Sequence, residues 1–288
     1  MISNKTKQII QRALLEDKVK QDKTTRLVIP AKKKGQAVIT AKEKGVLCGT
    51  DLVKFIFKKI DKKIKVEFFA KDADLINKEE KVATISGNLQ TILKAERVAL
   101  NFLSLLSGVA TTAWLFVNKV KKAKVAIKDT RKTTPGLRKL EKYAVLVGGG
   151  KNHRYSLAEG IIVKDNHLKA AGIVNKENKV NHKSLKEAIK KLRKKTKFPI
   201  EIEVETFQEF LEVAKYSPDI IMLDNFSKKD LVKAVGYRNK HFPKIELEAS
   251  GGISLRNIET VASTGVDSIS VGSITHSPKA LDFSLELN

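Results

Sequence analysis

Cations gather in three short segments, DTRKTTPGLR (129–138), NHR (152–154) and IIVKDNH (161–167). Arginine offers a planar fork that suits carboxylates and phosphates, and lysine offers a point charge. A single basic residue in a lysine-rich chain is usually a solvated surface residue. Here glycine or proline lies within or next to each segment, and each segment is expected near the end of a strand. The series therefore predicts an anion-binding site made of Arg131, Lys132, His153, Arg154 and Lys164.

Two carboxylates are expected opposite these cations. Glu203 lies within EIEVE, and Asp224 closes IIMLDN. Acidic groups on two neighbouring strands can hold Mg²⁺, usually through waters, or accept hydrogen bonds from sugar hydroxyls. The alternative is that either carboxylate is only an internal ion-pair partner of Lys164 or Arg131.

The strand pattern suggests which way these carboxylates face. In EIEVE (201–205) with the preceding Ile200, and in IELEAS (245–250), apolar residues alternate with acidic or polar ones. The apolar face suits packing under helices, so the acidic face points to the other side of the sheet. Unpaired buried ions cost several kcal/mol, so cations must meet them there. A charged barrel lumen satisfies the pattern, as does a wet face at the edge of an open sheet.

Two glycine-containing turns follow later strands. Glycine lets backbone N–H groups approach a phosphate, and the last two strand ends of a barrel are its habitual phosphate site. The turns predict a phosphate cradle of Ser250, Gly251, Gly252, Gly272 and Ser273.

The elements that must position these groups are strands and helices in alternation. From about residue 125, six short apolar runs are separated by helical patterns, some with capping-box spacing: Ser184 with Glu187, Thr206 with Glu209, and Ser227 with Asp230. This rhythm predicts a parallel α/β sheet, as a barrel or an open sheet. The first section, 1–112, shows strand-like runs and then an apolar helix from about Leu89.

Composition limits the class of protein. The 288 residues carry a net charge of +24, with lysines spread along the chain. Cys48 is the only cysteine, so no internal disulfide forms and a reducing compartment, the cytoplasm, is expected. The uncharged stretch 98–118 is long enough to cross a bilayer, but polar residues interrupt it, so a buried helix and no membrane partner are predicted. The histidines show no transition-metal spacing.

Taken together, these strings resemble the quinolinate phosphoribosyltransferases, or carboxylating nicotinate-nucleotide pyrophosphorylases. The series DTRKTTPGLR, GGGKNHR and KDNH is the most specific match. Further matches follow the family's order and span most of the chain: AKEKGVLCG (41–49), ERVALNFLSLLSGVAT (96–111), EIEVE (201–205), IMLDN (221–225), EASGGI (248–253) and GVDSISVGSITHS (265–277).

The resemblance implies a fold and an activity. The fold would be α/β, with an N-terminal α/β sandwich domain (1–112) and an irregular, incomplete parallel α/β barrel (113–275), and 276–288 would pack back on the first domain. The enzyme would transfer a phosphoribosyl group from phosphoribosyl pyrophosphate to quinolinate with Mg²⁺, releasing pyrophosphate and CO₂. The product would be nicotinate mononucleotide, a precursor of NAD.

The resemblance also implies roles for residues. Arg97 would reach quinolinate in the neighbouring subunit of a homodimer with shared active sites. Quinolinate's carboxylates would bind Arg131, Lys132, His153 and Arg154. Lys164 would lie near the reacting groups, Glu203 and Asp224 would serve ribose hydroxyls and Mg²⁺, and the glycine turns would hold the 5′-phosphate. The catalytic set would be Lys132, Lys164, Glu203 and Asp224.

Two departures and two alternatives accompany this prediction. The early segment EDKVKQDKTT (16–25) lacks the family's glycines, and the usual Asp-Gly-Asp turn reads Asp72-Ala73-Asp74. A paralogous group linked to molybdenum transport shares the fold, but the complete DTRKTTPGLR and NHR segments favour the quinolinate enzyme. A basic nucleic-acid-binding protein would cluster basic and aromatic residues on its surface. The strongest cations here instead flank carboxylates and glycine turns, so no nucleic-acid partner is expected.

Overall fold

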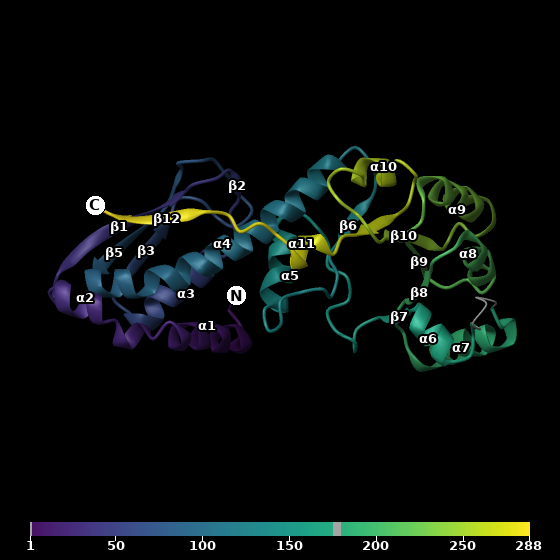
Figure 1. Ribbon diagram of the computed structural model, residues 1–288, viewed down its shortest axis with the longest axis horizontal. Helices are drawn as coiled ribbons and strands as arrows, with labels where there is room; N and C mark the ends of the chain where they lie inside the picture. Colours follow the sequence, from purple (N-terminus) through teal and green to yellow (C-terminus); the bar gives the residue numbers. More distant parts are fainter. Residues whose placement is uncertain (1, 175–179) are drawn as a thin grey trace. The chain divides into compact units, whose positions relative to one another are not determined.

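The computed structural model describes residues 2–174 and 180–288, which form two compact units (Figure 1). The first unit comprises 1–114, 133–149 and 274–288, and the second comprises 115–132 and 150–273. Both mix helices and strands, so the predicted α/β class is confirmed.

A four-stranded antiparallel sheet is the centre of the first unit, in the order β12-β1-β5-β3. Its strands are β1 (Lys34–Ala41), β3 (Lys65–Phe68), β5 (Lys81–Asn88) and β12 (Phe283–Leu287). The chain's last strand pairs with β1, joining Ala37 to Leu287 and Ala41 to Phe283. The short strands β2 (Gly45–Val46) and β4 (Leu75–Ile76) pair with each other in a separate two-stranded antiparallel sheet.

The first unit also contains helices. They are α1 (Asn4–Glu16), η1 (Val19–Gln21), α2 (Lys23–Val28), α3 (Thr50–Ile60), α4 (Leu89–Lys119), α5 (Arg138–Val147) and the short α11 (Ser273–His276). Helix α3 packs against β3 of the sheet. Ile56 and Phe57 on α3 and Ile39 and Ile85 on the sheet are fully buried. Figure 1 shows α3 and α4 running along the sheet.

Helix α4 is long and apolar enough to cross a membrane by length and composition, and more than half of its most apolar window is buried inside the protein. This burial is what a core helix shows. The helix continues without a break through Gly108. Glycine is required there because a Cβ would lie 2.3 Å from the carbonyl oxygen of Lys279.

The observed division differs from the predicted boundary near residue 112, because 133–149 belongs to the first unit. Helix α5 explains the difference. The Tyr143 hydroxyl donates to Asp72 at 2.7 Å, and Gly148 lies so close to α4 that a Cβ would meet the Ala110 carbonyl at 2.2 Å. These contacts attach α5 to the first unit although the sequence places it between barrel strands.

The second unit contains six parallel strands in the order β6-β11-β10-β9-β8-β7. They are β6 (Ala126–Lys128), β7 (Ile161–Val163), β8 (Ile200–Val204), β9 (Ile220–Asp224), β10 (Glu246–Ser250) and β11 (Ser268–Ser270). Each lies within one or two residues of a predicted apolar run. The edge strands β6 and β7 do not pair with each other in this order, so the barrel is incomplete as predicted.

Between these strands, the described part of this unit contains the helices α6 (Asp165–Ala170), α7 (His182–Lys195), α8 (Phe207–Ala214), α9 (Lys228–His241) and α10 (Ile258–Ala262). Two predicted N-termini are confirmed, since Thr206 and Glu209 form a capping box and Ser227 accepts from the Asp230 N–H. The predicted start at Ser184 is wrong. Asn181 is the N-cap of α7 instead, because its side-chain oxygen accepts a hydrogen bond from the Ser184 N–H and the helix begins at His182.

The two faces of the parallel sheet divide by polarity as predicted. The apolar set Ile200, Ile202 and Val204 is at most 2% exposed, while Glu201, Glu203 and Glu248 are buried on the opposite face. Side chains from β6, β8 and β10 converge there, which requires that face to be concave. The interpretation as a wet sheet edge is therefore wrong for these carboxylates.

Both sequence departures fall where the backbone has positive φ. Ala73 has φ 81° and Lys18 has φ 48°. The Ala73 turn keeps its form through other contacts, because Asp72 accepts from the N–H groups of Gly49 and Thr50.

We expect Ala73→Gly to stabilise the protein by a few tenths to ~1 kcal/mol, because glycine removes the cost of positive φ but adds chain entropy to the unfolded state. Urea unfolding measures the change. Ala171, exposed with φ −84°, is the matched control, and Ala171→Gly should not stabilise. An Ala73→Gly protein no more stable than wild type would contradict the strain argument.

Candidate functional site

A cavity of about 340 Å³ lies at the carboxyl ends of the parallel strands. Such a position is the usual place for an active site in α/β barrels. Its lining residues come from every strand end of the sheet and from the segment before β7: Thr130, Arg131, Lys132, His153, Arg154, Ile162, Lys164, Glu203, Met222, Asp224, Ser250 and Ser270. The structure thus brings together the five predicted cations, both carboxylates and Ser250.

The cations enter the cavity from two segments that lie side by side. Lys151 forms an isolated parallel β-bridge with Lys128 on β6, and the backbone N–H of Lys151 donates to the Ile127 carbonyl at 2.7 Å. Asp129, fully buried, accepts from the His153 N–H at 2.8 Å. Segment 150–154 therefore lies along the open edge of β6, which places Arg131 and Arg154 beside each other.

Electrostatics favours an anion here. Burial and the neighbouring Arg131 lower the pKa of Arg154, because two guanidinium groups in one half-buried cavity repel each other. A bound dianion would relieve this repulsion, so the cavity suits carboxylates or phosphates.

The two predicted carboxylates, Glu203 and Asp224, lie on adjacent strands. Glu203 on β8 pairs in register with Met222 on β9, two residues before Asp224. Glu203 is buried and forms an ion pair with Lys164. Asp224 accepts from the Asn225 side-chain amide at 2.8 Å. Glu203 is therefore an ion-pair partner of Lys164, as the alternative interpretation expected. Both residues also line the cavity, so a bound substrate could replace either one as the partner of the other.

The glycine turns follow β10 and β11. Gly251 has φ 87°, and a Cβ on it would lie 2.2 Å from the Asn225 side-chain oxygen, so only glycine fits. Ser250 lines the cavity, whereas its lining residues do not include Gly251, Gly252, Gly272 or Ser273. Their phosphate contacts stay predictions.

Arg97 lies in the first unit, on α4. Its side chain is 66% exposed, 3.9 Å from Glu96. It lines a separate hollow of about 350 Å³ with Glu16, Asp17 and Asn101. Its predicted reach into a partner's cavity stays a prediction.

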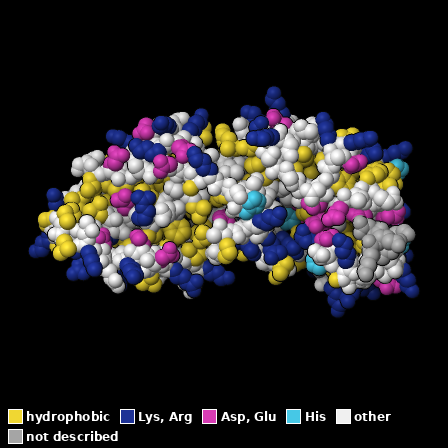
Figure 2. All heavy atoms as spheres, in the orientation of Figure 1, with side chains coloured by type: hydrophobic (Ala, Val, Ile, Leu, Met, Phe, Trp, Pro, Cys, Tyr) yellow, Lys and Arg dark blue, Asp and Glu magenta, His cyan; other side chains and the backbone are white. Residues whose placement is uncertain are grey.

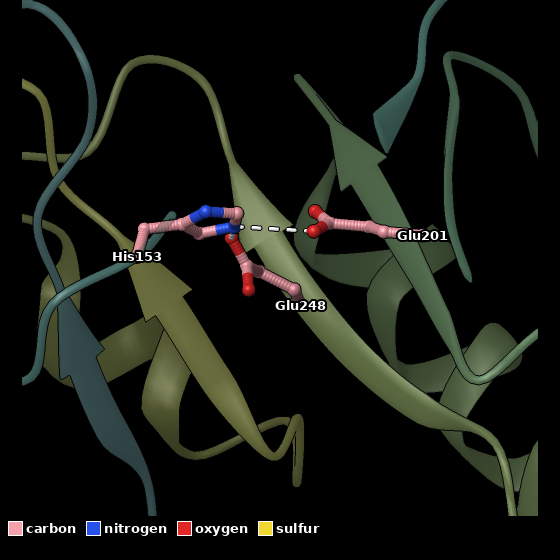
Figure 3. A group of neighbouring side chains, drawn as sticks. All are labelled: His153, Glu201 and Glu248. Atoms are coloured by element: carbon pink, nitrogen blue, oxygen red, sulfur yellow. Dashed lines mark ion pairs between the residues drawn. The ribbon is translucent and has the colours of Figure 1, made fainter. Parts of the chain in front are cut away.

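A second group of charges lies deeper in the concave face (Figure 3). The His153 Nε2 is 3.2 Å from a carboxylate oxygen of Glu201 and 3.2 Å from one of Glu248. Its Nδ1 accepts from the Arg154 N–H at 2.8 Å. Lys128 donates to Glu248 at 2.6 Å. We call Lys128, His153, Glu201 and Glu248 the lumen cluster.

The pKa values in the lumen cluster follow from burial and pairing. Burial raises the pKa of Glu201. Glu248 is also buried, but hydrogen bonds from His153 and Lys128 and their charges outweigh burial and lower its pKa to about 2. For His153, burial lowers the pKa, but the two glutamates outweigh it and raise the pKa to about 9. The hydrogen bond that Nδ1 accepts from the Arg154 N–H opposes this rise in pKa, because it requires an unprotonated Nδ1 and so favours the neutral ring.

The three acidic and imidazole groups could geometrically hold a metal ion, because their ligand atoms lie within 4.8 Å of one another. The contacts of Glu248 argue against it. Lys128 and the hydroxyls of Ser268 and Ser270 already donate to its two oxygens. The lumen cluster is thus an internal charge network.

The sequence indicated this network only in part. Alternation in EIEVE and IELEAS predicted that lumen carboxylates must meet cations. It could not identify His153 and Lys128 as those cations, because both approach from another part of the chain. Lys128, Glu201 and Glu248 were not among the predicted site residues.

Protonation of His153 should make stability depend on pH. With a folded pKa of about 9 and an unfolded value of about 6.5, the stabilisation is complete below pH ~6.5 and is lost as pH rises through 9. The unfolding free-energy difference between wild type and His153→Gln should therefore shrink by ~1–3 kcal/mol from pH 6.5 to 9. Exposed His241 provides the control variant, His241→Gln. A pH-independent difference would instead show that the Nδ1 bond keeps the ring neutral.

Comparison with known proteins agrees with this geometry. Residues 22–107 match the model of the quinolinate phosphoribosyl transferase N-terminal domain, and residues 109–286 match that of its C-terminal domain. The carboxylating nicotinate-nucleotide pyrophosphorylase of Arabidopsis thaliana, named as chloroplastic, is 38% identical over 98% of this chain and 82% of its own length.

Bacterial relatives match over similar lengths. A probable carboxylating nicotinate-nucleotide pyrophosphorylase of Bacillus subtilis is 38% identical over 98% of this chain and 93% of its own. The solved nicotinate-nucleotide pyrophosphorylase of Ehrlichia chaffeensis superposes with a TM-score of 0.88 at 36% identity, covering 98% of both chains. With both domain models matched in order and relatives aligned almost end to end, the chain belongs to the quinolinate phosphoribosyltransferase family.

Proposed function

We propose that this protein transfers the phosphoribosyl group of phosphoribosyl pyrophosphate to quinolinate with decarboxylation, giving nicotinate mononucleotide, pyrophosphate and CO₂. The observation that carries the proposal is one cavity that combines the predicted cations with Glu203 and Asp224. Family membership supports the same activity over the molybdenum-linked alternative.

Substrate binding follows from charge. Quinolinate is a dianion, and phosphoribosyl pyrophosphate carries phosphates at two ends. Arg131 and Arg154 can hold carboxylates through paired N–H groups, and Lys132 and Lys164 supply point charges. Ser250 and the glycine turn after it would hold the 5′-phosphate at the other side of the cavity.

The chemistry needs positioning more than reactive side chains. The pyridine nitrogen attacks the anomeric carbon with its lone pair as the bond to pyrophosphate breaks. The ribose becomes cationic in the transition state, so Glu203 and Asp224 stabilise it. The new pyridinium then accepts the electrons of the adjacent C–C bond as CO₂ leaves, and a proton from solvent or a nearby acid replaces it. Lys164, beside Glu203, favours departure of the anionic pyrophosphate.

Mg²⁺ fits the donor set. Glu203 and Asp224 offer carboxylate oxygens on neighbouring strands, the ligands this hard cation prefers. Because Lys164 occupies the Glu203 carboxylate, contact through water or substrate suits the site better than direct ligation. When bound with the donor, the ion would offset the charge of the pyrophosphate group.

The proposed assembly is a homodimer with shared active sites, in which Arg97 serves the partner's cavity. The proposed location is the cytoplasm, in keeping with Cys48 as a single, buried thiol. Burial raises the pKa of that thiol and so makes it unreactive.

The activity is tested by incubating the protein with quinolinate, phosphoribosyl pyrophosphate and Mg²⁺ and detecting nicotinate mononucleotide. Glu203→Gln and Asp224→Asn should lower kcat by ~10²–10³ with a smaller rise in KM for quinolinate, since each removes charge needed in the transition state. Glu205→Gln is the control, because Glu205 directly follows β8 and is exposed. A folded wild type that makes no product overturns the proposal.

The two carboxylates could instead serve only to neutralise lysines. In that case the amide variants would lower the melting temperature while the folded protein kept nearly normal kcat. Measuring both quantities on the same samples separates the outcomes.

Arg97 should act across subunits, which a mixed dimer can show. Arg97→Ala and Lys164→Ala homodimers should each lose most activity. A heterodimer of the two contains one cavity with an intact Lys164 and an intact Arg97 from the other subunit, so mixing should restore up to about a quarter of wild-type activity if subunits combine at random. Absence of recovery in heterodimers verified by tagged purification would refute the shared site.

A further inference from the structure

Three members of the lumen cluster, Lys128, Glu201 and Glu248, lie behind the proposed active site without being part of its lining, and the fourth, His153, lines it. His153 and Arg154 line the cavity, whereas Glu248 and Glu201 do not. The two glutamates are among the most buried charged groups in the described residues, with Glu248 fully buried and Glu201 3% exposed. Both lie 3.2 Å from the Nε2 of His153 (Figure 3).

We propose that Glu248, with Glu201 and Lys128, is a positioning residue that holds His153, and through it Arg154, in the orientation that binds the carboxylates of the acidic substrate. The inference rests on the proposed function and deepens it. It assigns the lumen cluster to binding of quinolinate rather than to the phosphoribosyl donor.

The contacts of the His153 ring form the first link. Both ring nitrogens contact protein groups: Nε2 faces the two glutamates, and Nδ1 accepts from the Arg154 N–H. The His153 N–H donates in turn to Asp129. The ring therefore fixes the peptide that carries the Arg154 side chain, and a change in ring orientation would move that side chain.

Glu248 is held by strands rather than by the loop that it supports. Lys128 on β6 donates to one carboxylate oxygen at 2.6 Å, and Ser268 on β11 donates to the same oxygen at 3.2 Å. Ser270 on β11 donates to the other oxygen. Since these donors belong to paired strands, the carboxylate presents a fixed reference point to the more irregular segment 150–154.

Stability alone does not account for such an arrangement. Burying ions carries a desolvation cost of several kcal/mol each, and apolar side chains of similar volume often fill such a space at no loss of stability. The lumen cluster instead orients the His153 ring. An apolar filling would leave the ring held only through Nδ1, whereas two carboxylates 3.2 Å from Nε2 also attract that side of the ring and favour the observed orientation.

The inference predicts which kinetic constant changes. Glu248→Gln keeps the size of the side chain but replaces one oxygen by an amide, which weakens its hold on His153 and Lys128. Misplacement of Arg154 should raise KM for quinolinate by ~10-fold. KM for phosphoribosyl pyrophosphate should change by less than ~2-fold, because the donor's ribose binds at Glu203 and Asp224. Glu246→Gln is the matched control: it lies on the same face of β10 but is exposed, and all constants should stay at wild-type values.

A double-mutant cycle separates positioning from a general structural role. If Glu248 acts through His153, adding Glu248→Gln to His153→Gln should change KM for quinolinate by less than ~2-fold further. Additive effects, equal increases in KM for both substrates, or a normal Glu248→Gln enzyme would each overturn the inference. If Glu248→Gln does not fold, Glu201→Gln contacts the same ring nitrogen and carries the same test.

These results are distinguishable from failure of the proposed function. If wild type forms no product from quinolinate, the function itself fails before the variants are compared. If wild type is active and Glu248→Gln is indistinguishable from it, the function stands and the positioning role falls.

Discussion

Burial of carboxylates inside the concave face of the parallel sheet is the constraint on which the second unit depends. Glu201, Glu203 and Glu248 are all buried, and each requires a cation or hydrogen-bond donor there. His153, Lys128 and Lys164 meet that requirement from outside β8 and β10. The charge balance thus fixes segments that the strand ladder alone would leave undetermined, above all 150–154 beside the open edge of β6.

The same constraint divides the concave face into two levels with different tasks. In the deeper level, Glu248 accepts hydrogen bonds from Lys128 and two serines, so its oxygens are already paired with protein groups. In the upper level, the Lys164–Glu203 pair faces the cavity, where substrate groups can exchange with either partner. A rigid network below an exchangeable one is what a site needs if it works by positioning and electrostatics. Lys and Arg side chains elsewhere are spread over the visible surface (Figure 2).

Much of this was predictable because local patterns report local structure. The runs at 200–204 and 220–224 give both the strands and the polarity of their two faces, since side chains alternate along a strand. The series DTRKTTPGLR, NHR and IIVK predicted the cations of the cavity, because parallel strands end at one edge of a sheet. Local patterns gave the wrong prediction where contacts in the folded chain decide the outcome. The cap of α7 is Asn181 rather than Ser184, and α5 belongs with the first unit.

By itself, then, the sequence determined the α/β class, the parallel strands, the cations that line the cavity and the need for cations opposite the lumen carboxylates. Tertiary structure alone decided which groups meet that need. Lys128 lies 120 positions before Glu248, and His153 lies 48 before Glu201, so no local pattern links them. Their contacts arise because the sheet curves, bringing alternate strands within reach of one imidazole, and curvature is a property of the assembled strands and not of any one of them.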